Sequence, residues 1–232
     1  VNAEVAGLKY RADIDGLRAL AVIPVIIYHA GAAWLPGGFV GVDVFFVISG
    51  YLISSILLKE MAENQFSFLG FYERRARRIL PALYLVIIFC MFAGWILLDP
   101  FELKELSQSV FATSIFSSNI YFYLKHGYFD VSSELKPLLH TWSLAVEEQF
   151  YLIFPISLFL LYKLGRSMTV ATYAILFLLS ILLASSITEG AFAFYMLPTR
   201  AWELLIGVFC AFILFDFKKS YSPILAQYLT IA

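Results

Sequence analysis

Long apolar segments alternate with short charged segments along the whole chain. Six apolar runs are long enough to cross a membrane, and they cover about residues 17–35, 39–58, 79–98, 144–164, 168–187 and 201–217. A segment needs roughly 20 apolar residues to cross the hydrocarbon core, and inside lipid it must be helical to satisfy its own backbone groups. The pattern therefore predicts an all-α fold, a polytopic transmembrane helix bundle.

One stretch between these runs, residues 101–123, has a softer pattern in which small polar residues alternate with apolar ones. Such a mixture is typical of a helix packed inside a bundle or of a re-entrant segment. The pattern leaves both open. Its polar members are Ser107, Ser109, Thr113, Ser114, Ser117, Ser118 and Asn119.

The distribution of lysine and arginine bears on the topology, because cytoplasmic loops carry the positive excess. With a cytoplasmic N-terminus and a segment 101–123 that does not cross, 12 of the 16 basic residues lie inside and four outside. If the segment crosses, the split becomes 11 to five. We favour the first arrangement.

Composition supports the membrane assignment. Hydrophobic residues make up 61% of the chain, charged residues 14%, and the mean hydropathy is +0.83. The lipid bilayer is the partner that this composition indicates. The net charge of −1 gives no information about other partners, and nothing indicates nucleic-acid binding. Cys90 and Cys210 both lie inside apolar runs, so the sequence encodes neither a disulfide framework nor a Cys/His metal site.

The two ends of the chain look incomplete. The first apolar run ends without a small-residue cleavage pattern, so we interpret it as a retained span rather than a signal peptide. The last run, residues 224–232, stops before it could span. We therefore expect residues 1–232 to form one membrane domain truncated at its C-terminus, with about 6–7 membrane helices and the start of another.

Two ionisable residues stand out in the first apolar run. Arg18 and His29 are 11 residues apart, which places them on nearly the same helix face with a rise of about 16 Å. Arg18 is equally explained as an interfacial anchor, and His29 as a histidine bonded to a neighbouring helix. A histidine this deep in a span needs a partner or a wet cavity, and ionisable groups inside a membrane are functional by default.

The second cluster is "FYERRARRILPA", residues 71–82, with four arginines just before a span. Basic residues at a cytoplasmic helix end are what topology requires, and composition alone favours this anchoring role. Arg75 and Arg78, one turn apart, would also suit forked binding of phosphate oxygens.

The third cluster is "PLLHTWSLAVEEQFYLIFP", residues 137–155, where Glu147 and Glu148 head an apolar run. Adjacent carboxylates point to different helix faces, so at most one faces a given cavity. A buried carboxylate suits acid/base work or a structural ion pair, with Arg200 or His29 as possible partners. In "FYMLPTRAWELLIG", residues 194–207, an intrahelical pair would explain Arg200 and Glu203.

These three motifs, with "YRADIDGLRALAVIPVIIYHA" and "LPGGFVGVDVFFVISGYLI", resemble the acyltransferase-3 family of bacterial membrane O-acyltransferases, in the family's order over about residues 8–210. The resemblance implies a bundle of about ten helices in the bacterial inner (cytoplasmic) membrane. Family members carry further helices beyond the point where this chain ends. Some also carry a C-terminal SGNH-type domain, which is a possible partner in the full-length protein, although no GDS-type serine motif of that domain is present here.

The resemblance also assigns roles to residues. It implies that the bundle moves an acyl group, commonly acetyl from acetyl-CoA, from the cytoplasmic side to a hydroxyl of a cell-envelope glycan such as lipopolysaccharide, peptidoglycan or an exopolysaccharide. Acetyl-CoA would then be the acyl donor, with no metal required. We expect catalytic roles for His29, Glu147, Asp43 and Tyr195, donor binding by Arg18, Arg75 and Arg78, and a place on the acceptor side for Arg200 and Trp142.

Two other classes of protein fit the same residues. A transporter or flippase would use His29, Glu147 and Arg200 as a proton or anion path and would move its substrate unchanged. A membrane-embedded assembly factor would use the charged clusters only to fix topology and helix pairing. We favour the acyltransferase, which consumes acyl-CoA and releases a free thiol.

Overall fold

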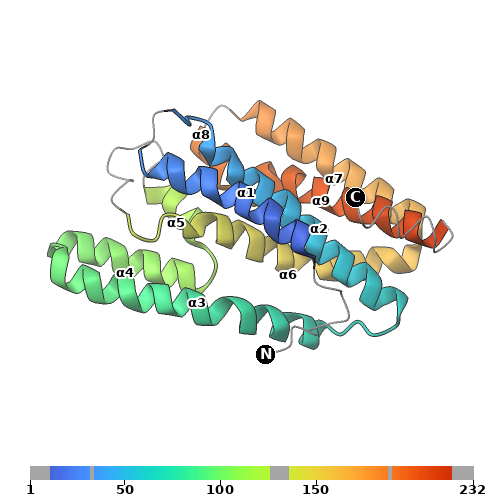
Figure 1. The fold of residues 1–232 in the computed structure, drawn as a ribbon, viewed down its shortest axis with the longest axis horizontal. Helices are drawn as coiled ribbons and strands as arrows, with labels where there is room; N and C mark the ends of the chain where they lie inside the picture. Colours follow the sequence, from blue (N-terminus) through green and yellow to red (C-terminus); the bar gives the residue numbers. More distant parts are fainter. Residues whose placement is uncertain (1–10, 32–33, 126–135, 188–189, 221–232) are drawn as a thin grey trace. The chain divides into compact units, whose positions relative to one another are not determined.

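The computed structural model describes residues 11–31, 34–125, 136–187 and 190–220, and within these ranges every regular element is a helix. The predicted all-α fold is confirmed (Figure 1). The apolar run at 224–232 and the basic residue Lys9 lie outside the described residues. The elements are α1 (Ala12–His29), the short 3-10 helix η1 (Gly38–Val40), α2 (Gly41–Ala62), α3 (Phe68–Leu97), α4 (Pro100–Ser114), α5 (Ser118–Lys125), α6 (Thr141–Leu164), α7 (Arg166–Ser186), α8 (Gly190–Tyr195) and α9 (Leu197–Ser220).

Within the described residues, five helical stretches are long and apolar enough to cross a membrane, which confirms the polytopic bundle. They are Gly38–Ala62, Phe68–Leu97, Thr141–Leu164, Arg166–Ser186 and Gly190–Asp216. The prediction for the first run needs a correction. The helix there covers Ala12–His29 rather than residues 17–35, and with Asp13, Asp15 and Arg18 among its 18 residues it is not one of the five.

The chain divides into two compact units, which are described separately here. The first contains residues 1–64 and 202–232, and the second contains residues 65–201. Helix α9 therefore begins in the second unit and continues in the first.

In the first unit, glycines allow helix backbones to pack in direct contact. A Cβ on Gly38 would lie 2.3 Å from the Pro24 carbonyl oxygen, so only glycine fits where η1 meets α1. The same holds between α2 and α9, where a Cβ on Gly50 would lie 2.0 Å from the Leu204 oxygen and one on Gly207 2.0 Å from the Val47 oxygen. Small residues at helix crossings are how membrane helices gain close packing without a hydrophobic driving force.

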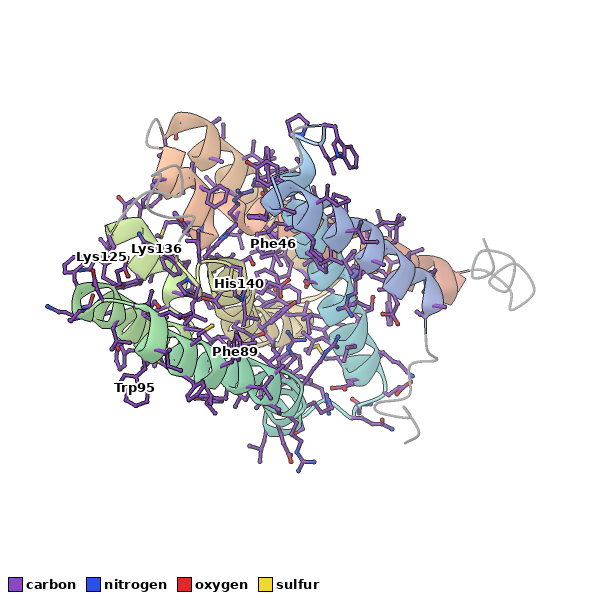
Figure 2. All side chains as sticks on the ribbon, turned by 60° about the vertical axis from the view of Figure 1, so that its left-hand side comes forward. Phe46, Phe89, Trp95, Lys125, Lys136 and His140 are labelled. Carbon is purple, nitrogen blue, oxygen red and sulfur yellow. The ribbon has the colours of Figure 1, made fainter. Side chains whose placement is uncertain are left out.

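In the second unit, α3 and α4 form an antiparallel hairpin. Asp99 ends the connection with a capping box, in which its side chain accepts from the Glu102 N–H and the Glu102 side chain accepts from the Asp99 N–H. Leu83, Ile87, Leu106 and Leu138 form the core beneath the hairpin. The opposite face of α3 is apolar and exposed, as expected for contact with lipid, and Figure 2 shows Trp95 projecting outward from it.

The ambiguous segment 101–123 forms two short helices instead of one crossing helix. α4 and α5 have 15 and 8 residues, so they rise about 22 Å and 12 Å against a hydrocarbon core of roughly 30 Å. Phe116 separates them with a φ of +53°, a left-handed conformation that interrupts the helix. Neither helix is long enough to cross, which agrees with the arrangement favoured from the basic residues, while the orientation of the N-terminus stays a prediction.

Candidate active site

The expected site residues are divided between the two units. Arg18, His29 and Asp43 belong to the first unit. The second unit contains the rest, which are Arg75, Arg78, Trp142, Glu147, Tyr195 and Arg200.

His29 is the last residue of α1, and its side chain is exposed. The helix therefore ends within the apolar run predicted at residues 17–35, and the depth of the imidazole in the membrane stays a prediction. The ring nitrogen Nδ1 lies 2.8 Å from the carbonyl oxygen of Val25. A carbonyl oxygen only accepts hydrogen bonds, so Nδ1 is the donor in this contact.

Arg18 lies 11 residues before His29 on α1, with a half-buried side chain. Its Nη1 is 3.9 Å from Asp15 Oδ1, one turn earlier, which is a long and partly exposed ion pair that adds little stability. Asp43 is in the first turn of α2, where the helix dipole favours a carboxylate.

The arginines of α3 differ in their surroundings. Arg75 turns inward, where its Nη2 donates to Glu148 Oε1 of α6 at 3.0 Å and its guanidinium lies 4.0 Å from the centre of the Tyr151 ring. Arg78 is exposed. Arg77 is also exposed and pairs with Glu73 within the same helix.

Glu148 was not among the predicted catalytic or binding residues. The sequence showed two adjacent carboxylates, and the expectation that they face different directions left open which one meets a cation. Glu148 makes the contact with α3, with its side chain 13% exposed, whereas Glu147 lies one position earlier on the half-buried part of α6. A cation placed one helix away cannot be read from the sequence of α6 alone.

Trp142, Tyr195 and Arg200 come together at the corner between α8 and α9. The Trp142 ring lies 4.4 Å from the Phe194 ring and 5.6 Å from the Tyr195 ring, between ring centres. Arg200 donates from Nε to the Phe194 carbonyl oxygen at 3.0 Å, and its guanidinium stacks 4.9 Å from the Phe194 ring centre. The corner therefore combines a buried phenol with a cation whose position is fixed by an aromatic ring and a backbone carbonyl.

Comparison with known proteins decides the family. The profile of the Acyl_transf_3 family, described as an acyltransferase domain, matches residues 11–230. The chain belongs to this family. The resemblance seen in the five sequence motifs is thus confirmed for the acyltransferase-3 family.

Two relatives of this acyltransferase-3 chain carry names that state an activity. The chain is 40% identical over 214 residues to "Peptidoglycan O-acetyltransferase OatA" of Listeria monocytogenes, a match covering 88% of this chain and 34% of the relative. It is 38% identical over 223 residues to "O-acetyltransferase OatA" of Staphylococcus aureus, covering 92% of this chain and 37% of the relative. The chain thus spans about a third of the length of the curated relatives it matches. No solved structure matches it.

Proposed function

We propose that this chain is the membrane part of an O-acyltransferase that moves an acetyl group from cytoplasmic acetyl-CoA to a hydroxyl of a cell-envelope glycan. The observation that carries the proposal is the match, over most of the chain, to two proteins named as O-acetyltransferases. Peptidoglycan is the favoured acceptor, because one of these names states it. The transporter alternative gains no support, since both the family and the relatives are acyltransferases.

In the proposed reaction His29 acts as the general base. Its Nδ1–H is engaged by Val25, so Nε2 takes the proton from the acceptor hydroxyl while that oxygen attacks the thioester carbonyl. The C–S bond breaks, an oxygen ester forms, and the proton passes to the departing CoA thiolate. Asp43, in the same unit as His29, would orient or balance the imidazolium, and Glu147 is proposed as a further catalytic carboxylate.

Donor binding is proposed for the arginines. Arg18 and Arg78 supply positive charge for the CoA phosphates, and Arg75 contributes N–H groups beyond the one held by Glu148. A rise of about 16 Å between Arg18 and His29 is comparable to the reach of a pantetheine arm.

The acceptor side is proposed to be the corner between α8 and α9. If Tyr195 accepts and relays the acyl group, its phenol oxygen takes the place of the acceptor hydroxyl in the first step and forms an acyl-tyrosine ester. The glycan hydroxyl then attacks this ester, the bond to the phenol oxygen breaks, and the phenol takes back the proton. Arg200 would stabilise negative charge on the reacting oxygen, and Trp142 packs beside the phenol. A C-terminal SGNH-type domain in the full-length protein would complete transfer to the glycan.

The test uses the full-length parent protein in its own membrane. His29→Ala should abolish release of CoA thiol from acetyl-CoA and O-acetylation of the glycan, at unchanged protein abundance, because the exposed side chain contributes little to packing. Loss of a general base costs about 10²–10⁴-fold in kcat. Wild-type transfer at normal abundance would remove His29 from the mechanism, and transport of a substrate without thiol release would favour the transporter.

A further inference from the structure

Two helix interruptions lie within the second unit. One is the left-handed Phe116 between α4 and α5, and the other is Met196 between α8 and α9. At such interruptions main-chain carbonyls lose their helical partners. Away from water these carbonyls need another donor, because an unpaired backbone group is costly inside a membrane protein.

Two side-chain amides supply these donors. Gln149 of α6 donates from Nε2 to the Phe116 carbonyl oxygen at 2.9 Å and to Asn119 Oδ1 at 2.8 Å. Asn119 of α5 donates from Nδ2 to the Tyr195 carbonyl oxygen at 3.1 Å and to Gln149 Oε1 at 3.4 Å. The two amides therefore bind each other reciprocally, and each uses its second N–H for one interrupted helix. We call Asn119 and Gln149 the amide clasp.

Asn119 of the clasp is buried and Gln149 is half-buried, and a layer of hydroxyl groups adjoins them. Asn119 is 1% exposed, and the adjacent Ser118 is fully buried. Ser118 Oγ donates to the Thr141 carbonyl oxygen at 2.9 Å, and Thr141 Oγ1 lies 3.1 Å from Thr113 Oγ1 of α4. A largely buried hydrogen-bond network of this kind favours one arrangement of the helices, since an alternative arrangement leaves polar groups unpaired.

The chemistry requires amides at these two positions. Each side chain must donate two hydrogen bonds and accept one. An ionised carboxylate has no donor, and a serine or threonine hydroxyl has only one donor on a side chain too short to reach the neighbouring helix. This requirement explains why amide side chains are present among apolar neighbours in α5 and α6. If each amide only stabilised its own helix, Asn119 and Gln149 would not need to bond to each other.

We propose that Asn119 and Gln149 are positioning residues that set the place of Tyr195 in acyl transfer. The clasp holds the Tyr195 main chain against α5 and α6, and the Tyr195 ring packs edge-on against Trp142 at the head of α6. Loss of the clasp frees the corner between α8 and α9 and moves the phenol out of line. The inference rests on the proposed function, in which Tyr195 accepts or relays the acyl group.

The test compares shape-matched substitutions in the full-length parent protein. Gln149→Met removes both donors at similar volume, and Gln108→Met is the matched control, because Gln108 on α4 contacts Tyr121 and lies outside the clasp. We expect Gln149→Met to lower kcat for glycan acetylation on the order of 10-fold to 100-fold with an unchanged KM for acetyl-CoA, as a misplacement near 1 Å would. Gln108→Met should leave both constants unchanged.

Combination with Tyr195→Phe separates positioning from general damage. If the clasp acts through Tyr195, the double variant with Gln149→Met is no slower than Tyr195→Phe alone. The proposal would be overturned if the fold-losses in kcat of the two single variants multiplied in the double variant. It would also be overturned by a wild-type kcat for Gln149→Met at normal abundance. Should Gln149→Met fail to accumulate, Asn119→Leu makes the same comparison from the other side of the clasp.

A readout without acyl chemistry distinguishes failure of this inference from failure of the proposed function. With Met196→Cys at the corner, Gln149→Met should raise the rate of labelling by a small maleimide several-fold, and Gln108→Met should not. Unchanged labelling overturns the clasp. A different result would be faster labelling of the Gln149→Met variant together with full activity of Tyr195→Phe. The clasp would then still determine the conformation of the corner, but its positioning role in acyl transfer would be overturned and Tyr195 would be removed from the proposed function.

Discussion

Arg75 of α3 and Glu148 of α6 form an ion pair, with Nη2 and Oε1 3.0 Å apart and side chains 17% and 13% exposed. Tyr151 lies one turn after Glu148 and carries the same guanidinium over its ring. Arg75 Nε is buried without a hydrogen-bond partner among the described residues. The arginine is therefore held by charge and by an aromatic face, which joins α3 to α6.

Removing the carboxylate should destabilise the protein more than removing both charges. Glu148→Gln leaves a largely buried guanidinium without its counter-ion, and breaking such a pair typically costs about 3–5 kcal/mol. We expect a lower thermal midpoint for the detergent-solubilised parent protein, and partial recovery in Arg75→Met/Glu148→Gln. If Arg75→Met alone weakens acetyl-CoA binding without lowering the midpoint, Arg75 is a donor ligand and the pairing is incidental.

Arg78 should act on donor affinity without acting on stability. Its side chain is exposed, so Arg78→Ala leaves the fold intact, while loss of a charge-assisted bond of about 1.5–3 kcal/mol weakens acetyl-CoA binding roughly 10-fold to 100-fold. Arg77→Ala is the control, because Arg77 already pairs with Glu73 on an exposed face. Equal effects of the two substitutions on Kd would indicate a general basic surface rather than a specific contact.

Arg200→Lys tests the corner between α8 and α9. Lysine keeps the charge but cannot reproduce both the Nε bond to the Phe194 carbonyl and the stacking on the ring. We expect acetylation of the glycan to fall at least 10-fold while the KM for acetyl-CoA is unchanged. Steady-state kinetics at saturating donor would check this. A matching rise in the KM would place Arg200 on the donor side instead.

The glycine contact between α2 and α9 predicts a strong steric effect. Gly50→Ala would place a Cβ 2.0 Å from the Leu204 oxygen, so the helices must separate, at a cost of about 1–3 kcal/mol in the free energy of unfolding. Gly16→Ala in α1 is the control, since a Cβ there meets nothing within 4 Å and alanine is the better helix former. A thermal midpoint unchanged by Gly50→Ala would contradict the close contact.

Much of the architecture followed from the sequence, because lipid imposes a simple rule on apolar runs. The runs at 39–58, 79–98, 144–164, 168–187 and 201–217 all became helices, and their limits were close to the predicted ones except for α3, which begins 11 residues before the predicted run. The first run was misjudged, since its charged residues belong to the helix and the helix ends at His29. Hydropathy reports composition and does not show where a backbone stops being helical.

The site was less accessible to sequence reasoning. Arg75 was singled out as a donor-binding residue, which stays a prediction, and its ion-pair partner Glu148 lies 73 residues away on another helix. Asn119 was noticed only as part of a polar mixture, and Gln149 was not singled out, because the meaning of each depends on the other. Pairwise contacts between distant segments leave no local periodicity from which they could be predicted.

The length of α3 has a consequence for how donor affinity is measured. Its 30 residues rise about 45 Å, so after the apolar run at 79–98 fills the hydrocarbon core, the turns that carry the arginines extend about 15 Å into the headgroup layer. Guanidiniums in that layer would be surrounded by lipid phosphates. If Arg78 binds the phosphates of the donor, as proposed, anionic phospholipids would compete for it, and the apparent dissociation constant of the donor would depend on the bilayer as much as on the protein.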